Sequence, residues 1–572
     1  MADNIPATLR QRLRAMTFSA SEARDAIRGV AVPDTLGRRV MRLCVIRGIR
    51  YHEEFAQSRQ AQGLRAWPEF ARALNARAIM SNSVPDMARD DDVPYCIWHP
   101  DTATEDTYRE LVRRYPRMAY QVARACAVAG YSELYRELEA GGSILPDVAV
   151  AEEARACGSQ DIYTAITSRP VRYRVMDDYS RSILAYPQPS GLNGDTATRP
   201  MLDAKQKFTI PRGDEDRVLG AGDCDGDQDL EDGDRSDDDF FSMIPEPGFK
   251  ETMFNITEDM NIDEFATPEP DDAADLAVAE YLAKPLPPDL PMGNKDILIL
   301  AAAYTGNVDR YARLRRPQMV DQEAGCVVRG IYHCPFFATW WATQTLLPRP
   351  CRHAAWIAQA IHARMIMSND LSRLTPDVPR DHLPYLIWYP AVAQPSTYKE
   401  VARRCPTMRP AVLRAAIYAK DRALFDELLD DVEPDPYLVG EARAHDHDHD
   451  DEEDEDEVRP SYFTRRLLAR AEKLGLADEM GNALSDRWGG ADSWKRFSVR
   501  SGGSGPHGMP ESGNWLFGGP SIVGAAQDPG IYNGVWADAS IAELFASAPE
   551  SWRPKKDGGE GVVQIDYEQW PQ

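Results

Sequence analysis

The sequence predicts an all-α protein made of two helical-hairpin modules, joined by a disordered acidic linker and followed by a glycine-rich tail. Three observations support this fold class. One long segment of the chain occurs twice. Small apolar residues recur at three- and four-residue spacing up to a glycine, which is the pattern of a short helix and its stop. Negative charge is concentrated between and inside the repeated segments, outside the helical patterns.

The duplication is visible by direct alignment. Residues 94–138 align without gaps on residues 384–428, and 20 of the 45 positions are identical. Unrelated sequences of average composition share roughly three positions over that length. The repeat therefore reflects duplication of a module within one chain. Further matching segments are 73–82 with 360–369, and 44–49 (CVIRGI) with 326–331 (CVVRGI).

A short aromatic motif, Pro-Tyr-x-Ile-Trp-x-Pro, is shared by both copies. We interpret its residues as structural positions, because a tryptophan can fill the gap between helices while its indole N–H is satisfied. The alternative is that the tryptophans line a ligand groove. The duplicated positions are Tyr95, Trp98 and Pro100 in the first copy, and Tyr385, Trp388 and Pro390 in the second.

The second half of each repeated segment predicts a helical hairpin. In the first copy Pro116 can occupy a first turn, and Gly130 can close the helix in the left-handed conformation. Ser132 can cap the next helix, in which Leu134 and Leu138 form an apolar stripe at i and i+4. In the second copy Pro410 takes the early-helix place, and Leu424 and Leu428 reproduce the apolar stripe.

Three fragments extend this pattern into a family resemblance. Residues 125–138 (ACAVAGYSELYREL), 154–166 (ARACGSQDIYTAI) and 300–311 (LAAAYTGNVDRY) resemble the inner helix, glycine turn and outer helix of an ankyrin repeat. The aromatic motif is similar to that of uncharacterised fungal ankyrin-like proteins. The resemblance implies stacked hairpins. The chain departs from the family in lacking a Thr-Pro-Leu-His start and a sustained period, so another helical solenoid is the alternative.

Charge and composition divide the chain. Residues 187–293 contain 27 Asp and Glu against 8 Lys and Arg, a net charge of -19, and residues 445–457 add -10, against -26 for the whole chain. The rest of the chain therefore carries about +3 by difference, which gives no basic footprint for nucleic acid. The predicted parts are module 1 (1–186), linker (187–292), module 2 (293–480, with an acidic insertion at 445–457) and a largely disordered tail (481–572).

The linker holds one candidate protein-binding motif. Residues 237–244 (DDDFFSMI) place Phe241 and Ile244 directly after a run of acids. This spacing resembles the linear motifs that add a strand to autophagy-type ubiquitin-like proteins. A chance match in an acidic linker is the alternative.

Motifs for catalysis or metal binding are incomplete. The segment 52–55 (HEEF) begins like a metalloprotease helix, but the second histidine is missing. His52 and His333 both follow the shared segment that ends in Gly-Ile, and we interpret them as loop anchors instead of an acid and a base. We therefore predict no catalytic residue, no cofactor site and no metal site, with the His-Asp run at 445–450 read as a solvated loop.

These observations favour an interaction scaffold or adaptor over an enzyme. The apolar runs are too short to span a bilayer, the start of the chain does not read as a signal peptide, and the nine cysteines lack CxxC spacing. We expect a cytoplasmic or nuclear protein that binds protein partners, not nucleic acid or membrane. The alternatives are a hydrolase with its site between the modules, and a nuclear adaptor associated with transcription or chromatin.

Overall fold

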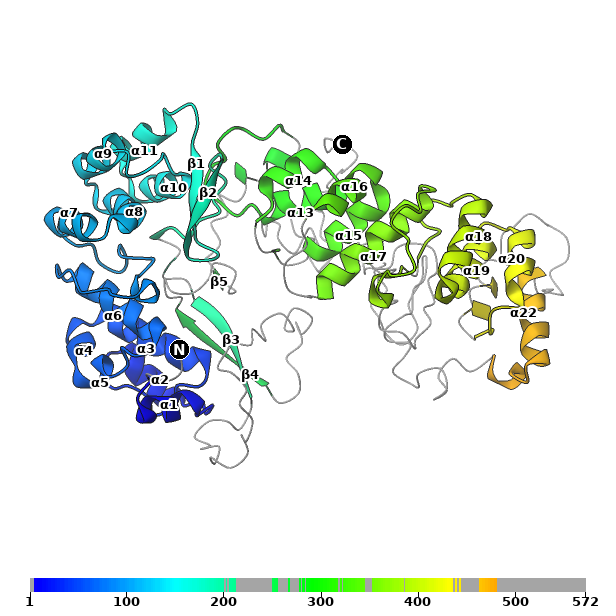
Figure 1. Ribbon diagram of the computed structural model, residues 1–572, viewed down its shortest axis with the longest axis horizontal. Helices are drawn as coiled ribbons and strands as arrows, with labels where there is room; N and C mark the ends of the chain where they lie inside the picture. The colour runs from blue at the N-terminus through cyan, green and yellow to red at the C-terminus, as the bar shows by residue number, and fades with distance from the viewer. Residues whose placement is uncertain are drawn as a thin grey trace, which may run out of the picture. The chain divides into compact units, whose positions relative to one another are not determined.

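The protein was analysed as a computed structural model of the 572-residue chain. It divides into two compact units, residues 1–271 with 287–293, and residues 272–286 with 294–572 (Figure 1). Tyr385, Phe241, Ile244, the insertion 445–457 and the tail 481–572 lie outside the described residues. The structure describes residues 5–199, 202, 205–211, 249–255, 266–267, 277–278, 280–282, 284–316, 319–320, 323–344, 352–384, 386–435, 438–439, 442–443 and 462–480.

The first group of helices in the first unit surrounds α3. That helix is buried over most of its length because it packs against α2 on one side and α6 on the other. Phe18, Met41, Ile46 and Phe70 belong to this core. The elements are α1 (Ala7–Arg14), α2 (Ala20–Ile27), α3 (Arg39–Tyr51), α4 (Glu53–Gln57), α5 (Arg59–Gln62) and α6 (Pro68–Met80).

The second group in this unit contains two stacked helical hairpins. Helix α8 packs against α10 and α9 against α11 (Figure 1). Gly130 and Gly158 close α8 and α10 with φ of 77° and 75°, so the predicted left-handed closure at Gly130 is confirmed. The elements are α7 (Glu105–Arg114), α8 (Ala119–Ala129), α9 (Ser132–Ala140), α10 (Val148–Cys157) and α11 (Gln160–Thr167).

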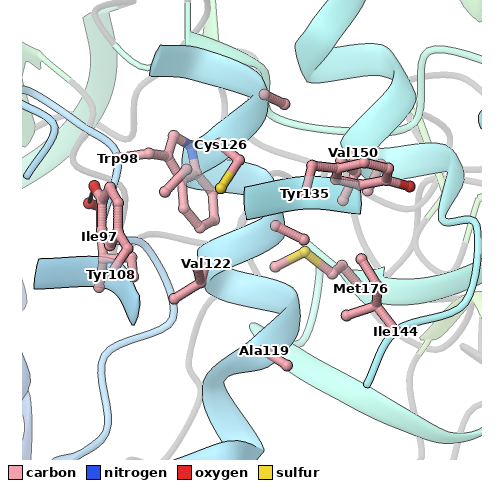
Figure 2. Close-up of a cluster of buried hydrophobic side chains, with 14 of the residues drawn as sticks. Ile97, Trp98, Tyr108, Ala119, Val122, Cys126, Tyr135, Ile144, Val150 and Met176 are labelled. Atoms are coloured by element: carbon pink, nitrogen blue, oxygen red, sulfur yellow. Dashed lines mark hydrogen bonds between the residues drawn. The ribbon is translucent and has the colours of Figure 1, made fainter. Parts of the chain in front are cut away.

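The core of these hairpins is built from small and aromatic side chains. Figure 2 shows Trp98 and Cys126 meeting beside α8, and Tyr135 of α9 next to Val150 of α10. Alanines and Cys126 let α8 and α10 approach closely, while the tyrosine and the tryptophan fill the space at either end.

The predicted cap of α9 was wrong. Ser132 is the first residue of the helix, and its side chain makes no capping hydrogen bond. The backbone N–H groups of both Gly130 and Tyr131 donate to the Cys126 carbonyl, so the left-handed turn closes α8 and leaves Tyr131 at the N-cap position. The apolar stripe is as predicted, because Leu134 and Leu138 are both buried.

Two small antiparallel sheets occur that the all-α prediction did not include. Strand β1 (Tyr173–Asp177) pairs with β2 (Ser182–Pro189), and a second sheet has the order β4 (Phe249–Asn255), β3 (Lys205–Pro211), β5 (Ala266–Thr267). Strand β2 crosses the boundary predicted at residue 186, and Leu192 and Ala197 beyond it are buried. The folded part of the first unit therefore continues past the predicted boundary.

In the part of the second unit that the structure describes, all of the regular secondary structure is helical. Together with the first unit this confirms the predominantly helical class, apart from the two sheets. No described helix is both long enough and apolar enough to cross a bilayer. The elements are α13 (Asp296–Thr305), α14 (Val308–Leu314), α15 (Glu323–His333), α16 (Pro335–Thr343), α17 (Arg352–Met367), α18 (Pro395–Arg404), α19 (Arg409–Tyr418), α20 (Arg422–Leu429) and α22 (Tyr462–Lys473).

The glycine of the shared Cys-Val-x-Arg-Gly-Ile segment permits the same close helix contact in both units. A β-carbon on Gly48 of α3 would overlap the carbonyl oxygen of Ala26, at the end of α2. A β-carbon on Gly330 of α15 would overlap the carbonyl oxygen of Ala303, at the end of α13. Any larger residue would have to push the two helices of the pair apart.

Candidate functional site

The residues of the aromatic motif that the structure describes lie largely in the interior. Trp98 and Trp388 have 1% and 0% of their surfaces exposed. Among the described residues the Trp98 indole N–H has no hydrogen-bond acceptor, in contrast to the expectation that it is satisfied. The Arg124 guanidinium lies 4.7 Å from the centre of the Trp98 ring instead, a cation–π contact. Pro100 and Pro390 follow cis peptide bonds.

A tyrosine on the following helix fixes this loop in the same way in both units. The Tyr108 hydroxyl of α7 donates to the Ile97 carbonyl at 2.9 Å, and the Tyr398 hydroxyl of α18 donates to the Ile387 carbonyl at 2.8 Å. Both tyrosines are almost fully buried. The tyrosine of the shared Thr-Tyr pair is therefore a backbone clamp, which fixes the loop just before each cis proline.

A Tyr–His ring contact recurs with its two partners exchanged. In the first unit Tyr51 lies edge-on to His99, and the hydroxyl is 2.7 Å from Nε2 of the imidazole. In the second unit His333 lies edge-on to Tyr389, with the same 5.8 Å between ring centres. Each contact joins the end of one helix to the residue before the cis proline. Each unit thus keeps one tyrosine ring in contact with one histidine ring, but the two residue types have exchanged positions.

The histidines aligned from sequence do not occupy equivalent places. A β-carbon on Gly29 would meet the His52 side chain, whereas one on Gly306 would meet Cys334. Cys334 is therefore the counterpart of His52, and His333 is the counterpart of a tyrosine. The His52 imidazole lies 3.1 Å from the Ile27 carbonyl at the end of α2, which agrees with an anchoring role.

A buried ionic network joins α8, α10 and the β1–β2 turn. Arg124 is fully buried and bonds the carboxylates of Glu153 at 2.9 Å and Asp178 at 2.7 and 3.0 Å. Tyr95 donates its hydroxyl to Asp178 at 2.7 Å, and the Ala197 backbone N–H donates to the same carboxylate. The network is satisfied from all sides and closed to solvent, so it holds segments together and offers no access to a substrate.

The electrostatics of this network follow from its composition of one cation and two acids. Burial disfavours the charge on Arg124, yet the two carboxylates outweigh it and hold the pKa of Arg124 above its ordinary range. Burial likewise opposes ionisation of Asp178, but the bonds from Arg124 lower its pKa overall. For Glu153 burial dominates, and its pKa is raised.

Among the described residues of the second unit, the most exposed aromatic side chain lies on α16. Phe336 is 79% exposed, and Trp340 lies one turn further along the same helix and is half-buried. The Trp340 ring stacks on Phe337 with 4° between the ring planes, and it lies edge-on to Tyr311 of α14. Trp340 is thus held rigidly by core rings, while Phe336 projects beside it. We call Phe336 and Trp340 the aromatic face.

Two arginines flank the aromatic face. The Arg315 guanidinium lies 5.4 Å from the centre of the Trp340 ring and bonds the Gln344 side chain. Arg373 is exposed and donates to the Ala342 carbonyl at the end of α16. Within the described part of the chain neither arginine forms an ion pair. The face is therefore apolar at its centre and positive at its side and end.

The equivalent face of the first unit has the opposite chemistry. Phe55 of α4 and Phe337 of α16 both stand 3.1 Å from the β-carbon position on Gly48 and Gly330, so α4 and α16 occupy corresponding places. The counterparts in the first unit are acidic or polar, and all of them except the half-buried Ser58 are exposed. The pairs, first unit before second, are Glu53 with Pro335, Glu54 with Phe336, Ser58 with Trp340 and Asp86 with Arg373.

Comparison with known proteins gives one similarity. Residues 98–197 match the protein family described as the YKP1 C-terminal domain. The matched range runs from Trp98 to Ala197, and so contains α7 to α11, both strands of the first sheet and the whole of the Arg124 network except Tyr95. No curated protein and no solved structure matches the chain. The match covers 100 of 572 residues, so it is a likeness of one segment.

The part of the chain that the structure describes holds no group of three or more His, Cys, Asp and Glu placed to bind a metal ion.

The sequence analysis did not identify the aromatic face, although the alignment of the two copies contains the residue differences that mark it. Continuing the match of 44–49 with 326–331 by ten residues sets Glu54 opposite Phe336 and Ser58 opposite Trp340.

Proposed function

We propose that this protein is an interaction scaffold built from two diverged copies of an ankyrin-like helical module. The stacked hairpins with left-handed glycines at Gly130, Gly158 and Gly306 support the ankyrin-like interpretation. The backbone clamp, the exchanged Tyr–His pair and the glycine-mediated helix contact, each present in both units, support a common origin. Such modules bind proteins through exposed side chains on a rigid helical frame.

The observation that carries this proposal is the aromatic face of α16. Phenylalanine and tryptophan exposed on a rigid helix, flanked by arginines, have the composition of binding hot spots in protein interfaces. Phe336 keeps 79% of its surface exposed, so its apolar surface is available to a partner. The corresponding acidic surface of the first unit lacks such a centre. We infer that the second unit binds a protein partner, in the cytoplasm or the nucleus.

Site-specific photo-crosslinking tests this function. The photoreactive residue p-benzoylphenylalanine replaces Phe336 in the full chain, and in a matched control it replaces Glu54 on α4. Irradiation in cells that express the chain is expected to give protein adducts at position 336 that are absent at position 54. The exposed position of both side chains keeps the fold intact. Equal adduct patterns at the two positions, or none at either, would overturn the proposal.

A further inference from the structure

We propose that the first unit carries a peptide-binding site, which takes a short segment with an aspartate followed by a leucine and which residues 287–290 of the same chain occupy. The site consists of Arg155, Arg172, Gly191 and Leu192, and we call it the Asp-Leu site. These four residues and the segment 287–293 all belong to the first compact unit. The inference does not depend on the aromatic face of α16.

The aspartate of the bound segment is recognised through its charge. The Asp289 carboxylate accepts a 2.6 Å bond from the Arg172 guanidinium and a 3.0 Å bond from the Leu192 backbone N–H. Partial burial opposes ionisation of Asp289, but these bonds outweigh it and hold its pKa below the ordinary value. An arginine beside a backbone donor therefore favours a charged carboxylate at this position over a neutral amide.

The leucine of the segment supplies an apolar anchor and a set of backbone bonds. Leu290 is fully buried. Its backbone N–H donates to the Leu192 carbonyl at 2.7 Å, and its carbonyl accepts a 2.9 Å bond from the Arg155 guanidinium. Backbone bonds to a bound segment supply affinity, and its side chains supply specificity. The contacts of Asp289 and Leu290 therefore specify a two-residue sequence.

Gly191 lets the segment lie directly against the backbone of the site. A β-carbon on Gly191 would overlap the carbonyl oxygen of Pro288. Gly191 is not among the described glycines with a positive φ, so its backbone conformation does not require glycine. The close approach of Pro288 does require it, because the atom that a side chain would meet belongs to the backbone.

Contacts that do not involve the segment hold the site in place. The Ser190 backbone N–H donates to the Arg172 carbonyl at 2.9 Å, and the Gly194 backbone N–H donates to the Glu152 carboxylate of α10 at 2.9 Å. Glu152 also pairs with Arg155. Because these bonds position the site before anything binds, little conformational entropy is lost when a segment docks there.

The site and its occupant come from different parts of the chain. All four residues of the Asp-Leu site lie within the matched range 98–197, whereas residues 287–290 lie outside it. The occupant is thus a separate piece of sequence bound to a site that the matched segment builds by itself. A partner protein that presents an aspartate and a leucine after a proline offers the same contacts and would displace residues 287–290.

Peptide binding to an opened form of the full chain tests the proposal. The substitutions Asp289→Ala/Leu290→Ser remove the resident side chains, and a fluorescein-labelled peptide of residues 287–293 is titrated by fluorescence polarisation. The opened chain is expected to bind the peptide at least about tenfold more tightly than the parent chain, in which the tethered segment competes. A peptide that carries the same two substitutions is expected not to bind. Equal affinities of the opened and parent chains would overturn the proposal.

Substitutions in the site show where the peptide binds. In the opened chain, Gly191→Ala and Arg172→Ala are each expected to weaken peptide binding at least about tenfold, the first by steric overlap and the second by loss of the charge-assisted bond. Arg169→Ala is the matched control, because Arg169 is an exposed arginine that pairs with Glu139. Peptide binding that is unchanged by either site substitution would contradict the proposed location.

Hydrogen exchange in the parent chain gives a measurement that needs no substitution, so it remains decisive if the opened chain does not fold. Excess isotope-labelled peptide is expected to speed exchange at the Leu290 amide of the chain, because the displaced segment loses its bond to the Leu192 carbonyl. Exchange at the Leu192 amide is expected to stay slow, because the aspartate of the peptide accepts the same bond. Unchanged exchange at Leu290 would show that residues 287–290 are a fixed part of the unit, and the proposal would fail.

Discussion

Glu323 provides a pH-dependent test of how the second unit is stabilised. Its carboxylate is 1% exposed at the start of α15. It accepts a 2.6 Å hydrogen bond from the Tyr311 hydroxyl and a 2.8 Å bond from the Val320 backbone N–H. No arginine or lysine bonds it among the described residues. Burial therefore dominates and raises the pKa of Glu323 to about 7, with the two hydrogen bonds acting against the shift.

The magnitude follows from the difference between the folded and unfolded pKa values. The shift from 4.5 to about 7 is roughly 2.5 units, which corresponds to about 3 kcal/mol at about 1.4 kcal/mol per unit. Because the folded pKa is raised, the folded state binds the proton more tightly. The free energy of unfolding is thus highest below pH 4.5 and falls as the pH rises toward 7.

Glu323→Gln isolates this effect, because its amide mimics the protonated acid and can bond both Tyr311 and Val320. We expect the variant and the parent chain to have nearly equal stability at pH 4.5, and the variant to be more stable by up to about 3 kcal/mol at pH 8. The measurement is amide hydrogen exchange of α15, which reports the second unit separately from the first. A stability difference that is the same at both pH values would refute the reasoning.

Three further predictions concern contacts shared by the units or confined to the first. Gly330→Ala is expected to destabilise the second unit by about 2 kcal/mol or more, because the new β-carbon would overlap the Ala303 carbonyl oxygen, although Ala is normally favoured over Gly in a helix interior. Denaturant unfolding of the variant beside the parent chain checks this prediction. Arg124→Met leaves two buried carboxylates unpaired and is expected to cost about 3 to 5 kcal/mol in the same assay. The single exchanges Tyr51→His and His99→Tyr are each expected to lower the melting temperature, while the double exchange recovers most of the loss, since the second unit carries that arrangement.

Local sequence patterns predicted the hairpins well because their determinants are local. A glycine after a run of small apolar residues sets the end of a helix, and both Gly130 and Gly158 have the left-handed conformation that this role requires. The apolar stripe at Leu134 and Leu138 identified the buried side of the next helix. Glu110 also pairs with Arg113 at 2.6 Å, because residues three apart on a helix are neighbours by geometry.

The strands could not be predicted in this way, because contacts distant in sequence stabilise them. The backbone N–H groups of Val175 and Met176 in β1 donate to the carboxylate of Asp147 at 3.0 and 2.7 Å. The same carboxylate caps α10 through Ala149 and Val150. One side chain thus orders both the start of a helix and a strand about 28 residues away. The local pattern of residues 173–189 does not indicate that Asp147 is the partner of this strand.

The aromatic face shows a second limit of prediction from sequence, which concerns the exposure of a side chain. Its core partners, Tyr311 and Phe337, come from two helices, so whether Trp340 is exposed or buried depends on the tertiary packing. The sequence does contain the contrast between the two copies, because the match from 44–49 extends into α4 and α16 without a gap. Reading the differences between aligned copies, as well as their identities, would have located the face.

Aligned residues of the two units differ in one way in the core and in another way on the surface, and this contrast bears on the proposed function. Inside, a replaced residue keeps its contact: Arg50 donates to the Cys96 carbonyl, and in its place Tyr332 donates to the equivalent Leu386 carbonyl. Outside, the replacement of Glu54 by Phe336 exchanges a charge for an exposed ring. Internal contacts that recur in both units, beside a face that is acidic in one unit and aromatic in the other, support the proposal that the aromatic face binds a partner. Stability alone gives no reason to expose a phenylalanine there.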